Sequence, residues 1–79
     1  MVKMIDMVVS ASQLRAARAA LDLRIRDVAA VAGVSPNTVT RLEAGEPVNH
    51  STMVVICQTY EAAGVDFLDG NGIRRRASA

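Results

Sequence analysis

The clearest alternation of hydrophobic and polar positions lies between Ser35 and Gly45 and predicts a short helix. Val39 and Leu42 are three positions apart and would face inward, with polar side chains around them. Ser35 is a good N-cap, and Pro36 suits the first helical position because no backbone donor is needed there. Gly45 fits the left-handed conformation that often follows a helix. The segment is therefore expected to be a capped helix with one polar face.

A second compact helix is predicted just upstream, over Ile25 to Ala32, with Val28, Ala29 and Ala32 as its apolar stripe. Gly33 and Val34 would form a tight turn between the two helices. A small residue such as Ala29 lets two helices approach closely over a short connection. Helix, glycine turn and capped helix together predict a helix-turn-helix unit.

A helix before this unit is predicted from Ser10, which forms a capping-box pattern with Gln13, to about Ala20. Its inward positions would be Leu14, Ala17 and Leu21, with Arg15 and Arg18 outside.

A further helix is predicted from Asn49, as N-cap, to Ala63, with Gly64 as its C-terminal cap. The expected core stripe is Met53, Ile56, Tyr60 and Ala63, with Cys57 at its edge. Val54 and Val55 lie off this stripe, and Glu61 is the only charged residue of the segment. A helix that is apolar nearly all round is normally covered on both sides, which favours a homodimer through this helix.

The two ends of the chain have β character. Residues 2–9 predict a short strand, or alternatively a frayed arm, and residues 65–68 and 73–76 flank an Asp-Gly-Asn-Gly turn typical of a hairpin. These strands are expected to pair within one subunit or between two. The predicted fold is mainly α, with four to five helices, in a single domain comprising a strand or arm at 1–9, a helical core at 10–64, and a hairpin with a basic tail at 65–79. The expected dimer contacts are Val54, Val55, Val65, Phe67, Ile5 and Met7.

The composition favours a function carried by the protein surface over one that needs a large buried active site. Seventy-nine residues allow one modest core, and hydrophobic content is 51% with only 3% aromatic residues. The net charge of +1 supports nucleic-acid binding weakly, but the arginines are clustered. A single cysteine excludes an internal disulfide, and no secretory or membrane-length segment is recognised, so a cytoplasmic protein is expected. His50 is the only histidine, which leaves no set of metal ligands or catalytic residues, and neither an enzyme nor a cofactor is expected.

The polar face of the predicted Ser35–Gly45 helix carries residue types that suit contacts with DNA bases. Asn and Arg pair bidentately with adenine and guanine edges in the major groove. The predicted base contacts are Asn37, Thr38 and Arg41, with Pro36 and Thr40 beside them; the alternative is an ordinary solvated face. Glu43 is expected to pair with a nearby arginine or to satisfy backbone donors, because its charge would repel DNA if it faced the groove. Ser35, Asn49, His50 and Ser51 lie at predicted helix starts, where free N–H groups attract phosphate. Arg74 to Arg76 could be edge-strand charge, a phosphate-binding arm or a solvated tail.

Two motifs are distinctive: Gln-Leu-Arg-Ala-Ala-Arg at 13–18, and the Ala-Gly-Val-Ser…Thr-Val-x-Arg-x-Glu-x-Gly pattern at 32–45. They resemble the XRE family, the Cro and phage-repressor type of helix-turn-helix domain, and residues 62–72 show weaker similarity to a bacterial subgroup. The chain departs from the family at Arg24, often a capping Ser or Thr, and at Ile25, often a phosphate-contacting Gln. Arg24 or Arg26 could replace that anchor.

The resemblance implies a bacterial or phage-like transcriptional regulator that binds a palindromic DNA operator as a homodimer, with repression as the default. Activation stays open, because Asp22 or Asp27 could contact RNA polymerase. A second hypothesis is an antitoxin or adaptor that binds a partner protein and autoregulates its own promoter. No membrane association is expected.

Overall fold

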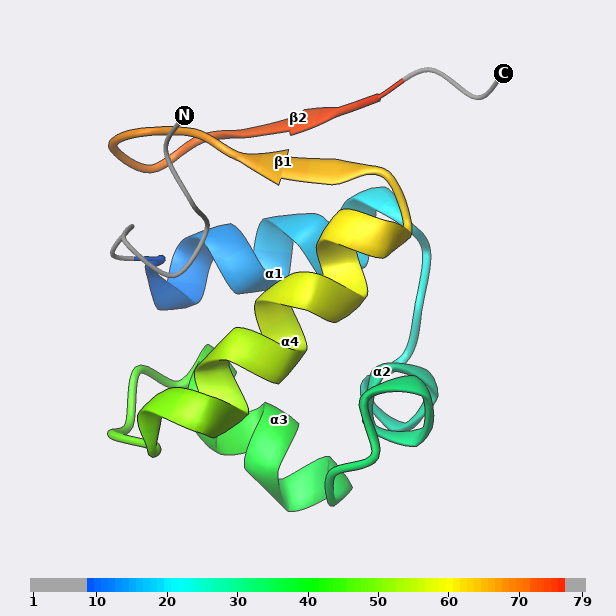
Figure 1. Ribbon diagram of the computed structural model, residues 1–79, viewed down its shortest axis with the longest axis vertical. Coiled ribbons are helices and arrows are strands. Elements are labelled where there is room, and N and C mark those ends of the chain that lie inside the picture. Colours follow the sequence, from blue (N-terminus) through cyan, green and yellow to red (C-terminus); the bar gives the residue numbers. More distant parts are fainter. Residues whose placement is uncertain (1–8, 77–79) are drawn as a thin grey trace.

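The computed structural model describes residues 9–76, which form four helices and one hairpin (Figure 1). The elements are α1 (Ala11–Ala20), α2 (Ile25–Ala32), α3 (Pro36–Glu43), α4 (His50–Ala62), β1 (Val65–Phe67) and β2 (Ile73–Arg75). The predicted mainly helical class is therefore confirmed, with four helices in the described part of the chain. Of the strand predicted over 2–9, residues 2–8, including Ile5 and Met7, lie outside the described residues.

One hydrophobic core joins all the elements. α4 crosses the molecule diagonally from α3 to the hairpin, and α1 lies beneath the hairpin (Figure 1). Tyr60 and Phe67, the only aromatic residues, meet edge to face with ring centroids 6.2 Å apart. The buried apolar residues are Val9, Leu14, Ala17, Val28, Ala29, Val39, Leu42, Ile56, Cys57, Tyr60, Val65 and Phe67.

The start of α1 is fixed by the predicted capping box. The Ser10 hydroxyl accepts from the Gln13 N–H at 3.1 Å, and the Gln13 side-chain oxygen accepts from the Ser10 N–H at 2.9 Å. The Gln13 amide nitrogen also donates to the carbonyls of Leu68 and Gly72, at 2.9 and 2.8 Å. Because Gln13 is fully buried, these bonds satisfy its amide and attach α1 to both ends of the hairpin loop.

The predicted hairpin forms within the chain. β1 pairs antiparallel with β2, with Val65 opposite Arg75 and Phe67 opposite Ile73. Val65 and Phe67 are 0% and 5% exposed and point into the protein's own core. Within one chain these two side chains are therefore covered by α4 and the rest of the core, and their part in a dimer interface stays a prediction.

α4 differs slightly from the predicted segment. It begins after Asn49, as predicted, but ends at Ala62, and Ala63 is exposed rather than in the core. The chain leaves the helix at Gly64, whose φ of 102° turns it toward β1. Cys57 is buried as predicted, and burial raises the pKa of its thiol to about 11, so it is a protonated core residue at neutral pH.

Candidate nucleic-acid interface

α2 and α3 form the predicted helix-turn-helix unit. The turn begins at Gly33, whose φ is 74°, and the N–H groups of Gly33 and Val34 both donate to the Ala29 carbonyl, at 2.9 and 3.0 Å. Ala29 is only 2% exposed, so its small side chain lies in the packed region that α2 contributes to the core. This compact turn gives α3 a defined direction relative to α2.

Both ends of α3 are capped as predicted. The Ser35 hydroxyl accepts from the Thr38 N–H at 3.2 Å, and Pro36 occupies the first turn. At the other end Gly45 has a φ of 82°; its N–H donates to the Leu42 carbonyl, and the Glu46 N–H donates to the Arg41 carbonyl at 3.0 Å. This pair of bonds is a Schellman motif, which fixes the backbone from α3 into the following loop.

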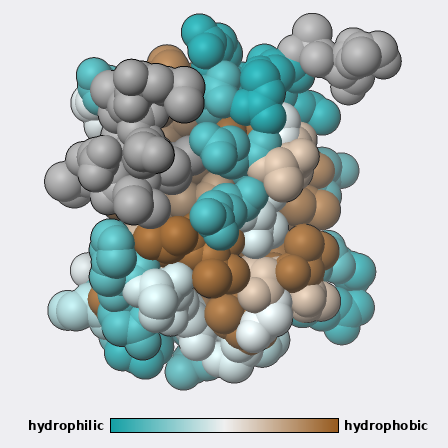
Figure 2. Space-filling model, in the orientation of Figure 1, coloured by the Kyte–Doolittle hydropathy of each residue, from teal (hydrophilic) through white to brown (hydrophobic). Residues whose placement is uncertain are grey.

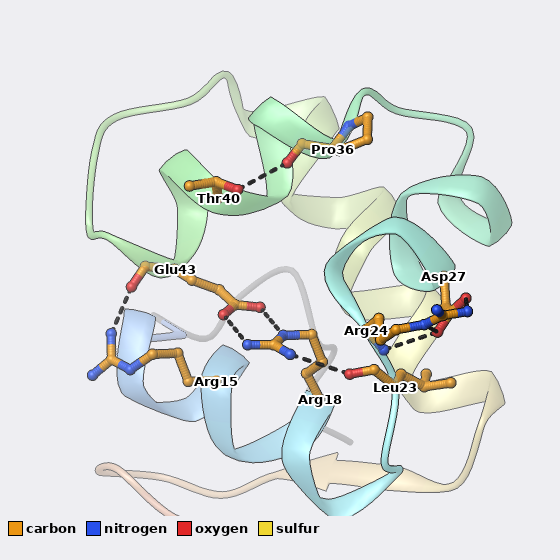
Figure 3. Close-up of polar contacts among 8 residues, drawn as sticks. All are labelled: Arg15, Arg18, Leu23, Arg24, Asp27, Pro36, Thr40 and Glu43. Atoms are coloured by element: carbon orange, nitrogen blue, oxygen red, sulfur yellow. Dashed lines mark hydrogen bonds and ion pairs between the residues drawn. The ribbon is translucent and has the colours of Figure 1, made fainter.

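The inner face of α3 is held by an ion pair as well as by packing. Glu43, 7% exposed, receives two hydrogen bonds from the Arg18 guanidinium, at 2.7 and 2.9 Å (Figure 3). Arg18 also donates to the Leu23 carbonyl, and Arg15 reaches the Glu43 carbonyl. The hydrogen bond to Glu43 raises the pKa of Arg18, against the opposing effect of burial. These contacts join α1, α3 and the loop before α2.

The structure corrects one prediction and confirms another at this ion pair. Arg18 was expected to lie outside, but only 26% of its side chain is exposed. It lies inward because the buried carboxylate of Glu43 needs a cationic partner. The prediction that Glu43 pairs with a nearby arginine is confirmed.

The outer face of α3 carries the predicted base-contacting residues. Pro36, Asn37, Thr40 and Arg41 are exposed, and Thr38 is partly buried. The Thr40 hydroxyl donates back to the Pro36 carbonyl at 3.2 Å (Figure 3). Arg41 makes a single ion-pair contact, from its Nε to a Glu46 carboxylate oxygen at 3.3 Å. The side chains that could meet a ligand thus share one solvent-facing side.

A shallow hollow links this outer face to the start of α4. Its volume is about 330 Å³, and it is lined by Thr38, Arg41, Pro47, Val48, Asn49 and Thr52. Asn49 caps α4 by accepting from the Thr52 N–H at 2.8 Å, and the exposed Ser51 hydroxyl donates to the same oxygen. His50 is also exposed. Sequence reasoning identified Asn49, His50 and Ser51 but missed Pro47, Val48 and Thr52, although the N-cap pattern at Asn49 implied a helix start there.

The two candidate anchors at the start of α2 differ in charge compensation. The Asp27 carboxylate accepts from the Arg24 backbone N–H at 2.9 Å and from its guanidinium at 3.2 Å (Figure 3). These hydrogen bonds, the backbone one first, lower the pKa of Asp27. Arg26 is exposed, and within residues 9–76 its side chain has no ion pair or hydrogen bond. Arg26 therefore offers the less compensated positive charge.

The C-terminal arginines are largely used within the hairpin. Arg74 and Arg76 both pair with Asp66, whose pKa is lowered chiefly by the hydrogen bond from Arg74. Arg75 donates to the carbonyl of Ala20 at the end of α1, at 2.8 Å. The structure adds a fourth role to the three considered for these arginines: Arg75 attaches the hairpin to α1.

A family model described as a helix-turn-helix domain matches residues 11–68. The matched region begins at the first residue of α1 and ends one residue after β1, which is more than half of the chain. The chain therefore belongs to this family of helix-turn-helix domains, and its fold and family define a DNA-binding protein. No curated protein and no solved structure matches the chain. Among residues 9–76, no helix is long and apolar enough to cross a membrane.

Proposed function

We propose that this chain is a sequence-specific transcriptional regulator of the XRE type, which inserts α3 into the major groove of an operator. Arg41 would contact guanine, Asn37 adenine or a phosphate, and Thr38 a base or a backbone oxygen. Pro36 and Thr40 would lie against the same groove. The observation that carries the proposal is the two-sided character of α3. Its inner face is held by Val39, Leu42 and Glu43, whereas Asn37, Thr40 and Arg41 on its outer polar face are exposed.

The surroundings of α3 support the positioning of the DNA backbone. The hollow beside Asn49 opens where α3 and the N-terminus of α4 meet, and helix N-termini favour phosphate because their first N–H groups lack helical partners. Exposed Ser35, His50 and Ser51 lie at such helix starts. Arg24 and Arg26 are placed to add charge at the start of α2, with Arg26 the stronger candidate.

A homodimer would bring two such helices to a palindromic operator. Figure 2 shows hydrophobic side chains gathered on the face that α4 crosses. On α4 itself, Val55 is 38% exposed and Val54 is partly buried. With two α3 helices about 34 Å apart, each would meet a half-site one DNA turn from the other. Repression by blocking polymerase is the default mode of action for such a dimer.

The same apolar face favours a second candidate, an antitoxin or adaptor that binds another protein through α4. Mass measurement of the purified protein separates the two: a tight homodimer supports the first, and a lone chain that aggregates supports the second.

Val55→Glu is expected to weaken the homodimer, because it places a charge in an apolar contact. Ala19→Glu adds the same charge to an exposed position of α1 and serves as control. A Val55→Glu protein that remains dimeric at low micromolar concentration would show that the interface lies elsewhere.

The test of the proposed function is selection of bound duplexes from a random DNA library, followed by footprinting on the DNA that flanks the gene. We expect enrichment of one short sequence in two inverted copies. Arg41→Ala should lose the preference for one base pair, whereas Arg74→Ala, which removes a charge from the hairpin at the opposite end of the molecule (Figure 1), should keep it. Absence of any enriched sequence with the wild-type protein would refute the proposal.

A further inference from the structure

Glu46 lies outside α3, yet it is joined to Arg41 of that helix by two separate contacts. Its backbone N–H donates to the Arg41 carbonyl at 3.0 Å, and its carboxylate accepts from the Arg41 Nε at 3.3 Å. The first contact belongs to the Schellman motif that ends α3, so the position of the Glu46 backbone is set by the helix itself.

The pairing replaces a contact that is usually apolar. In a Schellman motif the residue that donates the outer hydrogen bond often packs against the residue that accepts it through a hydrophobic side-chain contact. Here these two positions are Glu46 and Arg41, and an ion pair takes the place of that contact. Both side chains are about half exposed, at 55% and 47%, so the pair faces solvent on the side of α3 proposed to meet DNA.

The geometry of the pair leaves the reading edge of the guanidinium open. Glu46 contacts only Nε, and Nη1 and Nη2 of Arg41 have no hydrogen-bond partner among residues 9–76. Two parallel N–H groups on this outer edge are what a guanine needs for contacts to its O6 and N7. We propose that Glu46 is a positioning residue for base reading: it holds Arg41 through Nε and directs the Nη1–Nη2 edge at a guanine. This inference rests on the proposed function, with α3 in the major groove.

The alternative to a positioning role is that the Glu46 carboxylate simply repels the DNA phosphates. A carboxylate near DNA weakens binding to every sequence equally, because the phosphate charge does not depend on sequence. A positioning role acts differently: it reduces the conformational freedom that the long Arg41 side chain loses on contact with the base. The two effects therefore separate in the discrimination between bases, not in the overall affinity.

The experiment measures dissociation constants for the selected operator and for the same operator with one base pair changed. Arg41→Ala first identifies the base pair that Arg41 reads. Glu46→Ala is then expected to lower discrimination at that base pair by about two- to tenfold, which corresponds to the freedom of one long side chain. Glu46→Gln, whose side chain still accepts a hydrogen bond, should keep part of the discrimination at that base pair. Glu61→Ala removes the same charge from an exposed position of α4 and should leave discrimination unchanged.

A double variant completes the test. In the Arg41→Ala background, Glu46→Ala should no longer change discrimination, because the side chain that it positions is gone. Unchanged or increased discrimination in the single Glu46→Ala variant would overturn the inference, even if its affinity for all DNA rises. An Arg41→Ala protein that keeps every base preference would overturn it too, while leaving DNA binding in place. Failure of the wild type to bind any duplex would instead refute the proposed function.

Discussion

The last turn of α3 carries two ion pairs that differ in almost every respect. Glu43 faces α1 and receives two hydrogen bonds from Arg18, with side-chain exposures of 7% and 26%. Arg41, two positions earlier and so about 200° around the helix, makes one contact with Glu46, with exposures of 47% and 55%. One pair lies between helices, and the other lies on the surface of a single helix and its loop.

The difference shows how one short helix serves folding and recognition with the same types of residue. A largely buried carboxylate must keep its partner, since removing one member leaves a desolvated charge. An exposed pair contributes little to the free energy of unfolding, because water solvates either charge almost as well. The inner pair therefore holds α3 in place, and the outer pair is free to take part in binding.

The largest expected effect comes from breaking the inner pair. Glu43→Ala should lower the free energy of unfolding by about 2–4 kcal/mol, because it leaves Arg18 partly buried without a counter-charge. Glu46→Ala, the matched change in the outer pair, should lower it by less than about 1 kcal/mol. Urea denaturation of both variants measures the contrast. Equal losses would mean that burial does not distinguish the two pairs.

The outer side of α3 is expected to matter for DNA instead. Arg41→Ala should weaken binding to the selected operator by about 1–3 kcal/mol, the value of one bidentate base contact, and leave the free energy of unfolding nearly unchanged. Arg26→Ala should weaken binding to all sequences and lower the salt dependence by about one released counterion. Fluorescence anisotropy at several salt concentrations gives both quantities. Loss of fold in Arg41→Ala would contradict the division of α3 into two sides.

The Tyr60 hydroxyl offers a further test of the contacts on the inner side of α3. Its hydroxyl is buried and has no hydrogen-bond partner among the described residues, and burial, followed by the charge of Glu43, raises its pKa to about 12. Tyr60→Phe should therefore leave the free energy of unfolding unchanged or raise it by up to about 1 kcal/mol, because an unsatisfied polar group is removed. Thermal and urea denaturation can measure this. A loss of about 1 kcal/mol or more would indicate that the hydroxyl supports the Arg18–Glu43 pair.

The smallest expected effect is on stability at acidic pH, and it extends the comparison to the pairing of Asp66 with Arg74 and Arg76. Hydrogen bonds from Arg74 and Arg76 hold the pKa of Asp66 below its ordinary value of 3.8. Because the pKa of Asp66 is lower in the folded than in the unfolded state, its ionised carboxylate stabilises the folded protein at pH values above the unfolded-state pKa. This contribution is lost as the pH falls through the lowered pKa. Melting temperatures from about pH 6 to about pH 2.5 should therefore fall less steeply for Asp66→Asn than for the wild type. Asp69→Asn, an exposed change in the hairpin loop, should follow the wild type.

Local signals in the sequence predicted most of the secondary structure and the candidate site. The cap at Ser35, the capping box of Ser10 with Gln13, and the turn at Gly33 all act within a few residues, so a linear pattern contains them. The exposed positions of Asn37, Thr40 and Arg41 also followed, because Val39 and Leu42 define the inner side of the same helix.

Contacts between distant segments were decided only by the tertiary structure. Alternation placed Val65 and Phe67 on one side of a strand, but not whether that side meets the protein's own core or a second subunit. Similarly, Glu43 was expected to find an arginine, but the choice of Arg18 depends on how α1 lies against α3. By itself the sequence determined which residues form helices and, except at the end of α4, where these begin and end, because capping and turn energies are local. The packing of helices and hairpin determined the partner of each charge and which apolar sides are buried, because burial depends on every element at once.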